Sequence, residues 1–189
     1  MKNYLIILLL YVTLIGCKKT ENVKENDTET VTDTIAKAVT ATAIIEAKSN
    51  SAVSGTVTFT ENDGKVSMTA TFAGLTPGQH AIHIHEKGDC SAVDGSSAGE
   101  HWNPTHSEHG AWEHDGFHLG DIGNLEADEN GIATITKETD LWCIGCEDEN
   151  KNIIGKAIVV HKDVDDFKTQ PSGAAGDRIG CGAIVLEKD

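Results

Sequence analysis

Short runs of alternating apolar and polar residues dominate the chain from about residue 41 onward. The run AVSGTVTFT (52–60) alternates and stops at ENDGK, which is typical of a hairpin turn, and the run VSMTATFAG (66–74) follows it. Because successive side chains of a strand point to opposite faces, such runs predict strands with one buried face.

Eight segments of this kind are present, and they are separated by turn sequences. No segment has the apolar spacing of a helix, and no internal repeat is evident. We therefore expect an all-β domain, an antiparallel sandwich or barrel. The expected strands are 40–47, 52–60, 66–74, 80–86, 120–128, 131–138, 155–162 and 181–187.

The first forty residues follow a different pattern. Met1 and Lys2 precede YLIILLLYVTLIG, an apolar run that is short for a membrane span and typical of a secretory signal. It ends in LIGC, which resembles the lipobox of bacterial lipoproteins, and this implies that Cys17 carries lipid. We expect a signal peptide at 1–16, Cys17 with a flexible polar tether at 17–40, and one exported domain at 41–189. A plain secretory signal or a short anchor helix is the alternative.

This organisation predicts a protein of the bacterial cell envelope, bound to a membrane through Cys17, with its domain in the periplasm or at the cell surface. The charge of the chain also argues against nucleic acid as a partner. The chain has 30 acidic and 15 basic side chains and a formal net charge of −15, so it lacks the positive surface that nucleic acid requires.

The fourth expected strand carries histidines where an ordinary strand has Ser, Thr or Lys. Ile82 and Ile84 should face the core, whereas His83 and His85 share the opposite face. Two imidazoles side by side on a rigid strand can bind one metal ion. The alternative is a polar outer face that happens to consist of histidine.

The alternation fails after residue 90, and the loop that follows is rich in Gly, Ser, His and Asp. His101, His109, His118 and Asp121 lie in it, a set of ligands that suits tetrahedral zinc. His161 ends a later apolar strand. Spacing alone does not choose among the nine histidines, and His106 and His114 in the same loop compete for the zinc role.

Five motifs together resemble the copper/zinc superoxide dismutases over nearly all of residues 41–189. They occur in the order and at spacings compatible with that family, and the resemblance implies an eight-stranded, immunoglobulin-like Greek-key barrel with long metal-binding and active-site loops. The motifs are HAIHIHEKGDC (80–90), GEHWNPTH (99–106), HLGDIGN (118–124), VHKDVDD (160–166) and GDRIGCG (176–182).

The resemblance also implies a role for each histidine of the site. The residues that match copper ligands are His83, His85, His101 and His161, and those that match zinc ligands are His101, His109, His118 and Asp121. His101 would bridge the two metals and, with Arg178, act in catalysis.

The remaining residues of these motifs match supporting roles. Asp165 matches a carboxylate that joins one ligand of each metal, and His80 matches a supporting hydrogen-bonding residue. His106 and His114 fall at positions that are not ligands. Lys162 and Lys168 are weaker candidates for guiding an anion, and solvated surface lysines are the simpler interpretation of both.

Four cysteines remain once Cys17 is assigned to lipid, and four cysteines allow three pairings. The resemblance implies a disulfide between Cys90 and Cys181, which leaves Cys143 and Cys146 to pair with each other. Their Cys-x-x-Cys spacing can be a redox motif, but no thioredoxin-like βαβ pattern surrounds it. A small structural staple is therefore the better interpretation.

The expected function is disproportionation of superoxide to oxygen and hydrogen peroxide, with copper as the redox metal and zinc as its structural neighbour. The expected partners are the superoxide anion, a membrane and, in a homodimer, a second copy of the chain. The alternative is a non-catalytic lipoprotein that stores or delivers copper or zinc. A third interpretation, an adhesive β-sandwich, does not explain the arrangement of the histidines.

Overall fold

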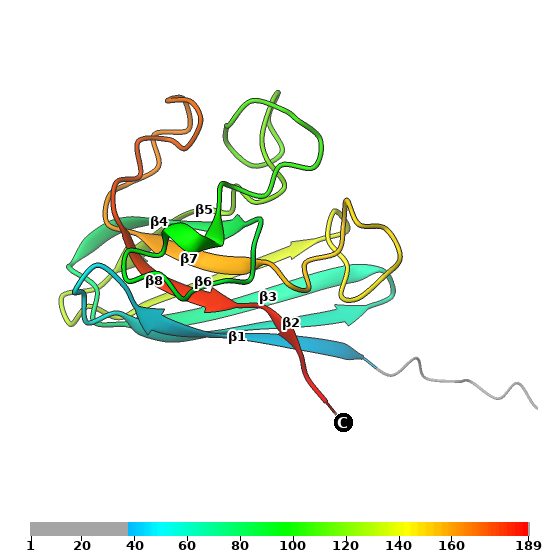
Figure 1. Cartoon of the computed structure of the whole chain (residues 1–189), viewed down its shortest axis with the longest axis horizontal. Coiled ribbons are helices and arrows are strands. Elements are labelled where there is room, and N and C mark those ends of the chain that lie inside the picture. Colours follow the sequence, from blue (N-terminus) through cyan, green and yellow to red (C-terminus); the bar gives the residue numbers. More distant parts are fainter. Residues whose placement is uncertain (1–37, 189) are drawn as a thin grey trace, which may run out of the picture. The chain divides into compact units, whose positions relative to one another are not determined.

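The computed structural model describes residues 38–188, which form an all-β domain (Figure 1). In this part of the chain there is no α-helix, only the short 3₁₀ helix η1 (Ser96–Ala98). The strands are β1 (Val39–Ala47), β2 (Ser54–Asn62), β3 (Lys65–Ala73), β4 (Gly78–His85), β5 (Gly123–Ala127), β6 (Ala133–Thr139), β7 (Ala157–His161), β8 (Arg178–Ala183) and β9 (Val185–Leu186).

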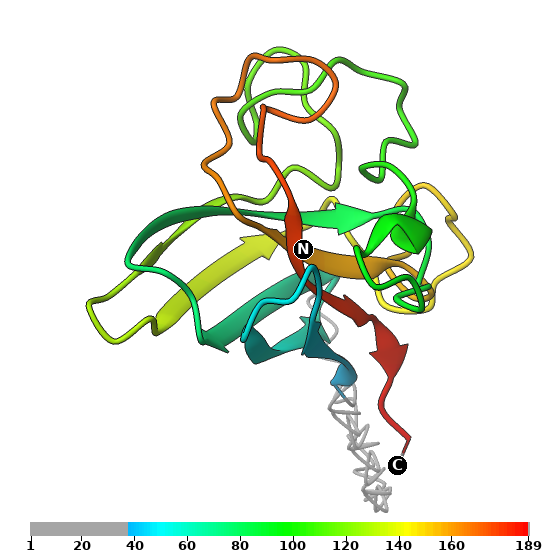
Figure 2. The same cartoon turned by 60° about the vertical axis from the view of Figure 1, so that its left-hand side comes forward.

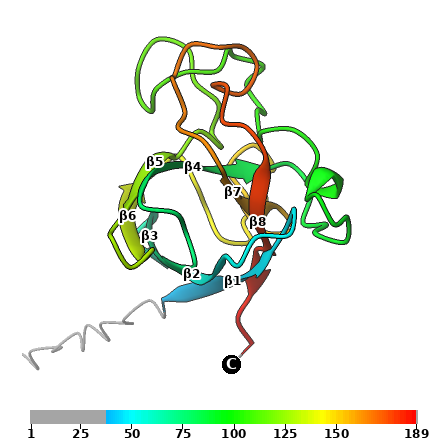
Figure 3. The ribbon, with the colours of Figure 1, turned by 90° about the vertical axis from the view of Figure 1, so that its left-hand side faces the viewer.

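The eight main strands form an antiparallel sheet in the order β5-β4-β7-β8-β1-β2-β3-β6, and β9 pairs with β1 beside this path. Strands β5 and β6, at the two ends of the order, contact each other, so the sheet curls into a nearly closed barrel (Figure 3). Strands β4, β5 and β6 are neighbours both along the chain and around the barrel, and β3, which precedes β4, lies beside β6. This order is a Greek key. The predicted fold class is confirmed.

The alternation seen in the sequence becomes the core of the barrel. In β3, every second residue from Val66 to Phe72 is buried, and those between are exposed. The inward side chains of the other strands join them in one apolar cluster, in which Phe59 and Trp142 meet edge to face. Burial of this continuous apolar surface is the main force that holds the barrel together.

Most strands begin or end one to three residues away from the expected bounds. Val39, assigned to the tether, belongs to β1, which begins one residue before the expected strand 40–47. The single strand expected at 181–187 is divided, because Ile184 is fully buried and its backbone bonds to the β6–β7 connection, with its N–H donating to the Lys156 carbonyl (2.8 Å). The predicted signal peptide, Cys17 and nearly all of the tether lie outside the described residues.

Two long loops lie next to each other on one side of the barrel (Figure 2). Residues 86–122 join β4 to β5, and residues 162–177 join β7 to β8. Gln170 connects these loops by accepting a hydrogen bond from the His109 N–H (2.8 Å) and donating one to the His109 carbonyl (2.9 Å). The two loops therefore form one layer over the outer surface of β4 and β7.

Both expected disulfides are present. Cys90–Cys181 ties the start of the β4–β5 loop to β8, and Cys143–Cys146 closes a small loop after β6. Across residues 38–188, no helix has the length and apolar character needed to span a membrane.

Candidate metal centre

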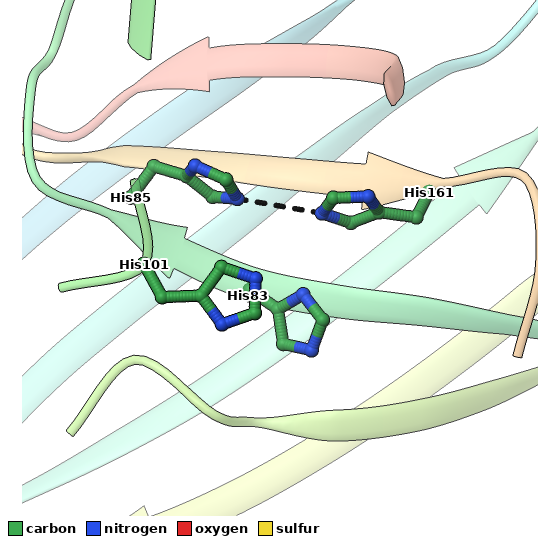
Figure 4. Close-up of side chains that lie close together, drawn as sticks. All are labelled: His83, His85, His101 and His161. Carbon is green, nitrogen blue, oxygen red and sulfur yellow. Dashed lines mark hydrogen bonds between the residues drawn. The ribbon is translucent and has the colours of Figure 1, made fainter. Parts of the chain in front are cut away.

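The outer face of β4 supplies the first part of the site. Ile82 and Ile84 point into the core, whereas His83 and His85 point outward and are buried only because the loops cover them. His161 ends β7, where the ladder with β8 has an irregularity, and it lies on the same outer side (Figure 4). The loop adds His101, which forms a β-bridge with His85.

These residues form the four-histidine set: His83, His85, His101 and His161. One ring nitrogen of each lies within 4.8 Å of one from every other member. The Nε2 atoms of His85 and His161 are 3.3 Å apart, and the rings of His83 and His101 have centroids separated by 4.0 Å. Nitrogen ligands at this spacing suit copper in both of its common oxidation states.

Backbone carbonyls orient two of these rings. The Nδ1–H of His85 donates to the Gly99 carbonyl (2.9 Å), and that of His161 donates to the Gly176 carbonyl (3.4 Å). Each bond fixes the tautomer so that Nε2 is left free as a ligand.

A second cluster, the Asp121 set, shares His101 with the first and consists of His101, His109, His118 and Asp121. The Asp121 carboxylate lies 2.9 Å from His101 Nδ1, 2.9 Å from His109 Nδ1 and 3.3 Å from His118 Nδ1. The Nε2–H of His118 donates to the Ser107 carbonyl (3.2 Å), which leaves Nδ1 for the cluster. Three nitrogens and one carboxylate oxygen are a suitable ligand set for tetrahedral zinc.

Buried nitrogen atoms that lack hydrogen-bond partners indicate that the two sets can bind metal ions. Among the described residues, four buried ring nitrogens make no hydrogen bond of acceptable geometry, namely His83 Nδ1, His101 Nε2, His109 Nδ1 and His118 Nδ1. The last two lie near the Asp121 carboxylate, at 2.9 and 3.3 Å, without being aligned for a hydrogen bond to it. A buried polar atom left unpaired costs about 1–3 kcal/mol, and such atoms are rare in folded proteins. All four belong to the two sets, so a cation in each set would satisfy them.

The carboxylate of Asp165 joins the two sets. The Nε2–H of His83 donates to Oδ2 (2.8 Å), and the Nε2–H of His109 donates to Oδ1 (2.9 Å). Asn124 holds the Asp165 backbone from both sides, because its amide donates to the carbonyl (2.9 Å) and its oxygen accepts from the N–H (2.8 Å). A Cβ at Gly173 would overlap this carboxylate, so the loop needs glycine there.

Burial controls the charge of the four-histidine set. Desolvation lowers the pKa of His83 to about 4, although the hydrogen bond to Asp165 opposes the shift. The pKa values of His85 and His161 are also lowered, first by burial and then by neighbouring imidazoles. These rings are therefore neutral near pH 7, the form that binds a metal ion.

Carboxylates control the Asp121 set. Burial disfavours the charged imidazole of His109, but Asp121 and Asp165 outweigh it and raise the pKa to about 9. Burial likewise opposes ionisation of Asp121 and Asp165, yet hydrogen bonds from the histidines hold the pKa of each well below its usual range. The ionised carboxylates of Asp121 and Asp165 keep negative charge at this set, which favours the binding of a divalent cation.

Two further predicted residues lie beside the four-histidine set. Arg178 pairs with His161 across the β7–β8 ladder, and its guanidinium donates to the Gly95 carbonyl (2.9 Å). His80 is buried, its Nδ1–H donates to the His161 carbonyl (3.0 Å), and its Nε2 lies 3.1 Å from the Thr76 hydroxyl. His80 therefore supports the backbone of a ligand and belongs to neither set.

The other candidates belong to neither set, although His106 lines the surface pocket that His101 and His118 also line. His106 and His114 are exposed loop residues, and Lys162 and Lys168 are exposed as well. The residues that sequence reasoning missed are Asn124, Gly173 and the carbonyl groups of Gly99, Ser107 and Gly176. The glycines around the motifs were the only sign of these contacts, because a bond to a backbone carbonyl leaves no residue-type signature.

Comparison with known proteins decides the family. The family model described as "Copper/zinc superoxide dismutase (SODC)" matches residues 53–184, which is well over half of the chain. The chain belongs to the copper/zinc superoxide dismutase family. A solved structure similar to this member of the family is titled "Crystal Structure Analysis of the clock protein EA4" and is 35% identical, with a TM-score of 0.70 over 78% of this chain and 94% of that one.

Proposed function

We propose that the protein is a superoxide dismutase in which the four-histidine set binds copper and the Asp121 set binds zinc. The observation that carries the proposal is the completeness of the site. Four imidazoles surround one position, and the guanidinium-bearing Arg178 pairs with His161 at its side. A protein that only stored metal would have no need for an arginine beside the redox position.

A bound copper ion supplies reversible one-electron chemistry, through which two superoxide anions and two protons become one O2 and one H2O2. The protein's own residues position the substrate and move protons. Arg178 attracts and orients the anion, because a guanidinium presents several donors in a fixed plane. When His101 Nε2 is not bonded to a metal, it can hold a proton and donate it to the reduced oxygen species.

The net charge of −15 does not conflict with an anionic substrate. The field in a cleft depends on nearby charges and low-dielectric walls more than on the total charge. Arg178 provides a positive charge beside His85 and His161, whereas the ionised carboxylates of Asp121 and Asp165 lie behind the imidazoles and are hydrogen-bonded to them. Superoxide is therefore guided locally, although the molecule as a whole repels it.

The alternative function is a non-catalytic copper- and zinc-binding lipoprotein. Both functions require the same ligands, so only a measurement of turnover separates them. Metal analysis of the purified protein combined with a superoxide-dismutation assay is the test. One bound zinc with no copper uptake and no activity would contradict the enzyme proposal and support the alternative.

The variant His161→Ala makes this test specific. Removal of one nitrogen from the four-histidine set should abolish dismutation, whereas zinc content should remain at one equivalent because His161 is not in the Asp121 set. His114→Ala is the matched control, since His114 is exposed and outside both sets, and it should change neither quantity. Loss of zinc in His161→Ala would mean that the division of ligands is wrong.

The location of the enzyme is proposed from the sequence. The lipobox-like LIGC and the polar residues after it support a lipid anchor on Cys17, which would hold the domain at a membrane of the cell envelope. Incorporation of labelled fatty acid into the wild type, and its loss in Cys17→Ala, would support this anchor. Label in both proteins would contradict it.

A further inference from the structure

A surface pocket of about 500 Å³ opens next to the Asp121 set. Two of the four members of that set, His101 and His118, contribute to its lining. Each is only 5% exposed, and each has a buried ring nitrogen without a hydrogen-bond partner. The inner end of the pocket is thus formed by histidines that need a ligand.

The pocket is lined by two members of the Asp121 set but by only one member of the four-histidine set, the shared His101. His83, His85 and His161, which belong only to the four-histidine set, are absent from its lining, and so is Arg178. An ion that enters here therefore meets the Asp121 set first.

The mouth of the pocket is acidic. Glu86, Glu100 and Glu108 line it and are exposed, and no Lys or Arg belongs to the lining. Lys87 lies 3.2 Å from Glu86, but both side chains are exposed and such surface pairs are weak. A cluster of three carboxylates raises the local concentration of divalent cations and repels anions such as superoxide.

The wall of the pocket also orients one of its histidines. The Ser107 carbonyl accepts the Nε2–H of His118, and the Asn103 side chain fixes Ser107 by donating to the same carbonyl (2.8 Å) and accepting from the Ser107 N–H (3.0 Å). Asn103 and Ser107 both line the pocket. The ring of His118 is consequently held with Nδ1 available for a metal ion.

We propose that this pocket is the entrance through which a divalent cation reaches the Asp121 set, separate from the approach of superoxide beside Arg178. The proposal rests on the zinc assignment made under Proposed function. Beyond that assignment, the proposal states how the metal ion arrives. The ion passes through the mouth formed by the three glutamates, and their negative charge speeds its uptake.

Metal uptake by the metal-free full-length protein can be followed with Co²⁺, because the visible absorption of tetrahedral Co²⁺ reports filling of the set. The signal belongs to the Asp121 set if His118→Ala removes it. The triple variant Glu86→Gln, Glu100→Gln, Glu108→Gln should take up Co²⁺ about tenfold more slowly at low ionic strength, with the difference shrinking as salt is added. The matched control Glu126→Gln, Glu129→Gln, Glu138→Gln removes three charges outside the lining and should slow uptake much less.

A second pair of variants separates the route from the general field. Glu108→Gln and Glu108→Trp lose the same charge, but the indole would also fill the mouth, so Glu108→Trp should be several-fold slower than Glu108→Gln. Equal rates for this pair would overturn the proposed route, as would a triple variant no slower than its control. Failure of the wild type to bind Co²⁺ or Zn²⁺ in the Asp121 set would instead overturn the zinc assignment itself, and the entrance with it.

Discussion

At the scale of single residues, the buried carboxylate of Asp165 accepts one hydrogen bond from each metal set. His83 and His109 both present Nε2–H to it, so their Nδ1 atoms are the ones left for metal ions. Such a carboxylate fixes the tautomer and the orientation of the rings that it holds. Asp165 therefore orients one histidine of each set without belonging to either.

The substitution Asp165→Asn should weaken at least one of the two sets. An amide has one oxygen where Asp165 has two, so one histidine would face an N–H group and lose its bond. We expect the affinity for at least one metal to fall about 10–100-fold, measured by competition with a chelator of known affinity.

Asp166→Asn is the control for this measurement, because the Asp166 side chain is exposed and bonds only within its own turn, to Lys168 and Thr169. Equal affinities in the wild type and Asp165→Asn would show that Asp165 does not orient the ligands.

The members of the two sets could be predicted from the sequence because each lies in a short motif with its own spacing. The choice of nitrogen on each ring could not, since it depends on partners far along the chain. Asn124 and Asp165 are 41 residues apart, and the carbonyl groups of Gly99 and Gly176 act through the backbone. Local spacing contains no information on such contacts.

At the scale of elements, the β4–β5 loop is attached to the barrel by the Cys90–Cys181 disulfide and by contacts with β4, and also by aromatic packing and a buried hydrogen bond at Trp142. The Trp142 Nε1–H donates to the Leu119 carbonyl (2.9 Å), next to the ligand His118. Trp112, from the loop, packs with its ring centroid 5.2 Å from that of Trp142. The loop is thereby held against the core rather than lying free in solvent.

The variant Trp142→Phe tests this attachment. It keeps an aromatic ring but leaves the Leu119 carbonyl without its donor, which should lower the free energy of unfolding by about 1–3 kcal/mol and weaken binding at the Asp121 set. Thermal unfolding and zinc competition measure the two effects.

Trp112→Phe is the matched control, because among the described residues the Trp112 indole makes packing contacts but no hydrogen bond. If both substitutions had equal effects, ring size and not the hydrogen bond would hold the loop.

At the scale of the whole molecule, the two disulfides differ in how much of the chain they span. Cys90 and Cys181 are 91 residues apart, whereas Cys143 and Cys146 are 3 apart. A cross-link restricts the unfolded chain more when it closes a longer loop. The first disulfide therefore contributes to the stability of the entire barrel, and the second acts locally.

Replacement of each cysteine pair by alanine should reveal this difference. Loss of Cys90–Cys181 should cost about 4–5 kcal/mol and loss of Cys143–Cys146 about 1–2 kcal/mol, measured by denaturant unfolding of the metal-free protein. A larger loss from the shorter loop would show that Cys143–Cys146 has a structural role beyond its own turn.

The metal-free protein should lose stability as the pH falls from about 6.5 to about 4. In this window the unfolded chain takes up protons on His83, His85 and His161, whereas the folded protein resists them because burial lowers their pKa values, that of His83 to about 4. His109 does not mask the effect, since its raised pKa of about 9 gives a contribution that is already complete below pH 6.5.

Thermal unfolding of chelator-treated protein at steps of pH would measure this loss. The same experiment on metal-loaded protein is the comparison, because bound metal competes with protons for the same nitrogens and should displace the transition to lower pH. A melting temperature that stays constant over the window would contradict the pKa shifts of the three histidines.

No member of the two sets comes from the interior of the barrel. His83, His85 and His161 lie on the outer face of β4 and β7, the other members lie in the β4–β5 loop, and Ile82 and Ile84 pack inward. Chemistry and folding thus draw on different positions of the same strands. Natural variation or protein engineering can erase, alter or rebuild the site by changing one face of two strands and the loops above it, while the sequence that folds the barrel remains as it is.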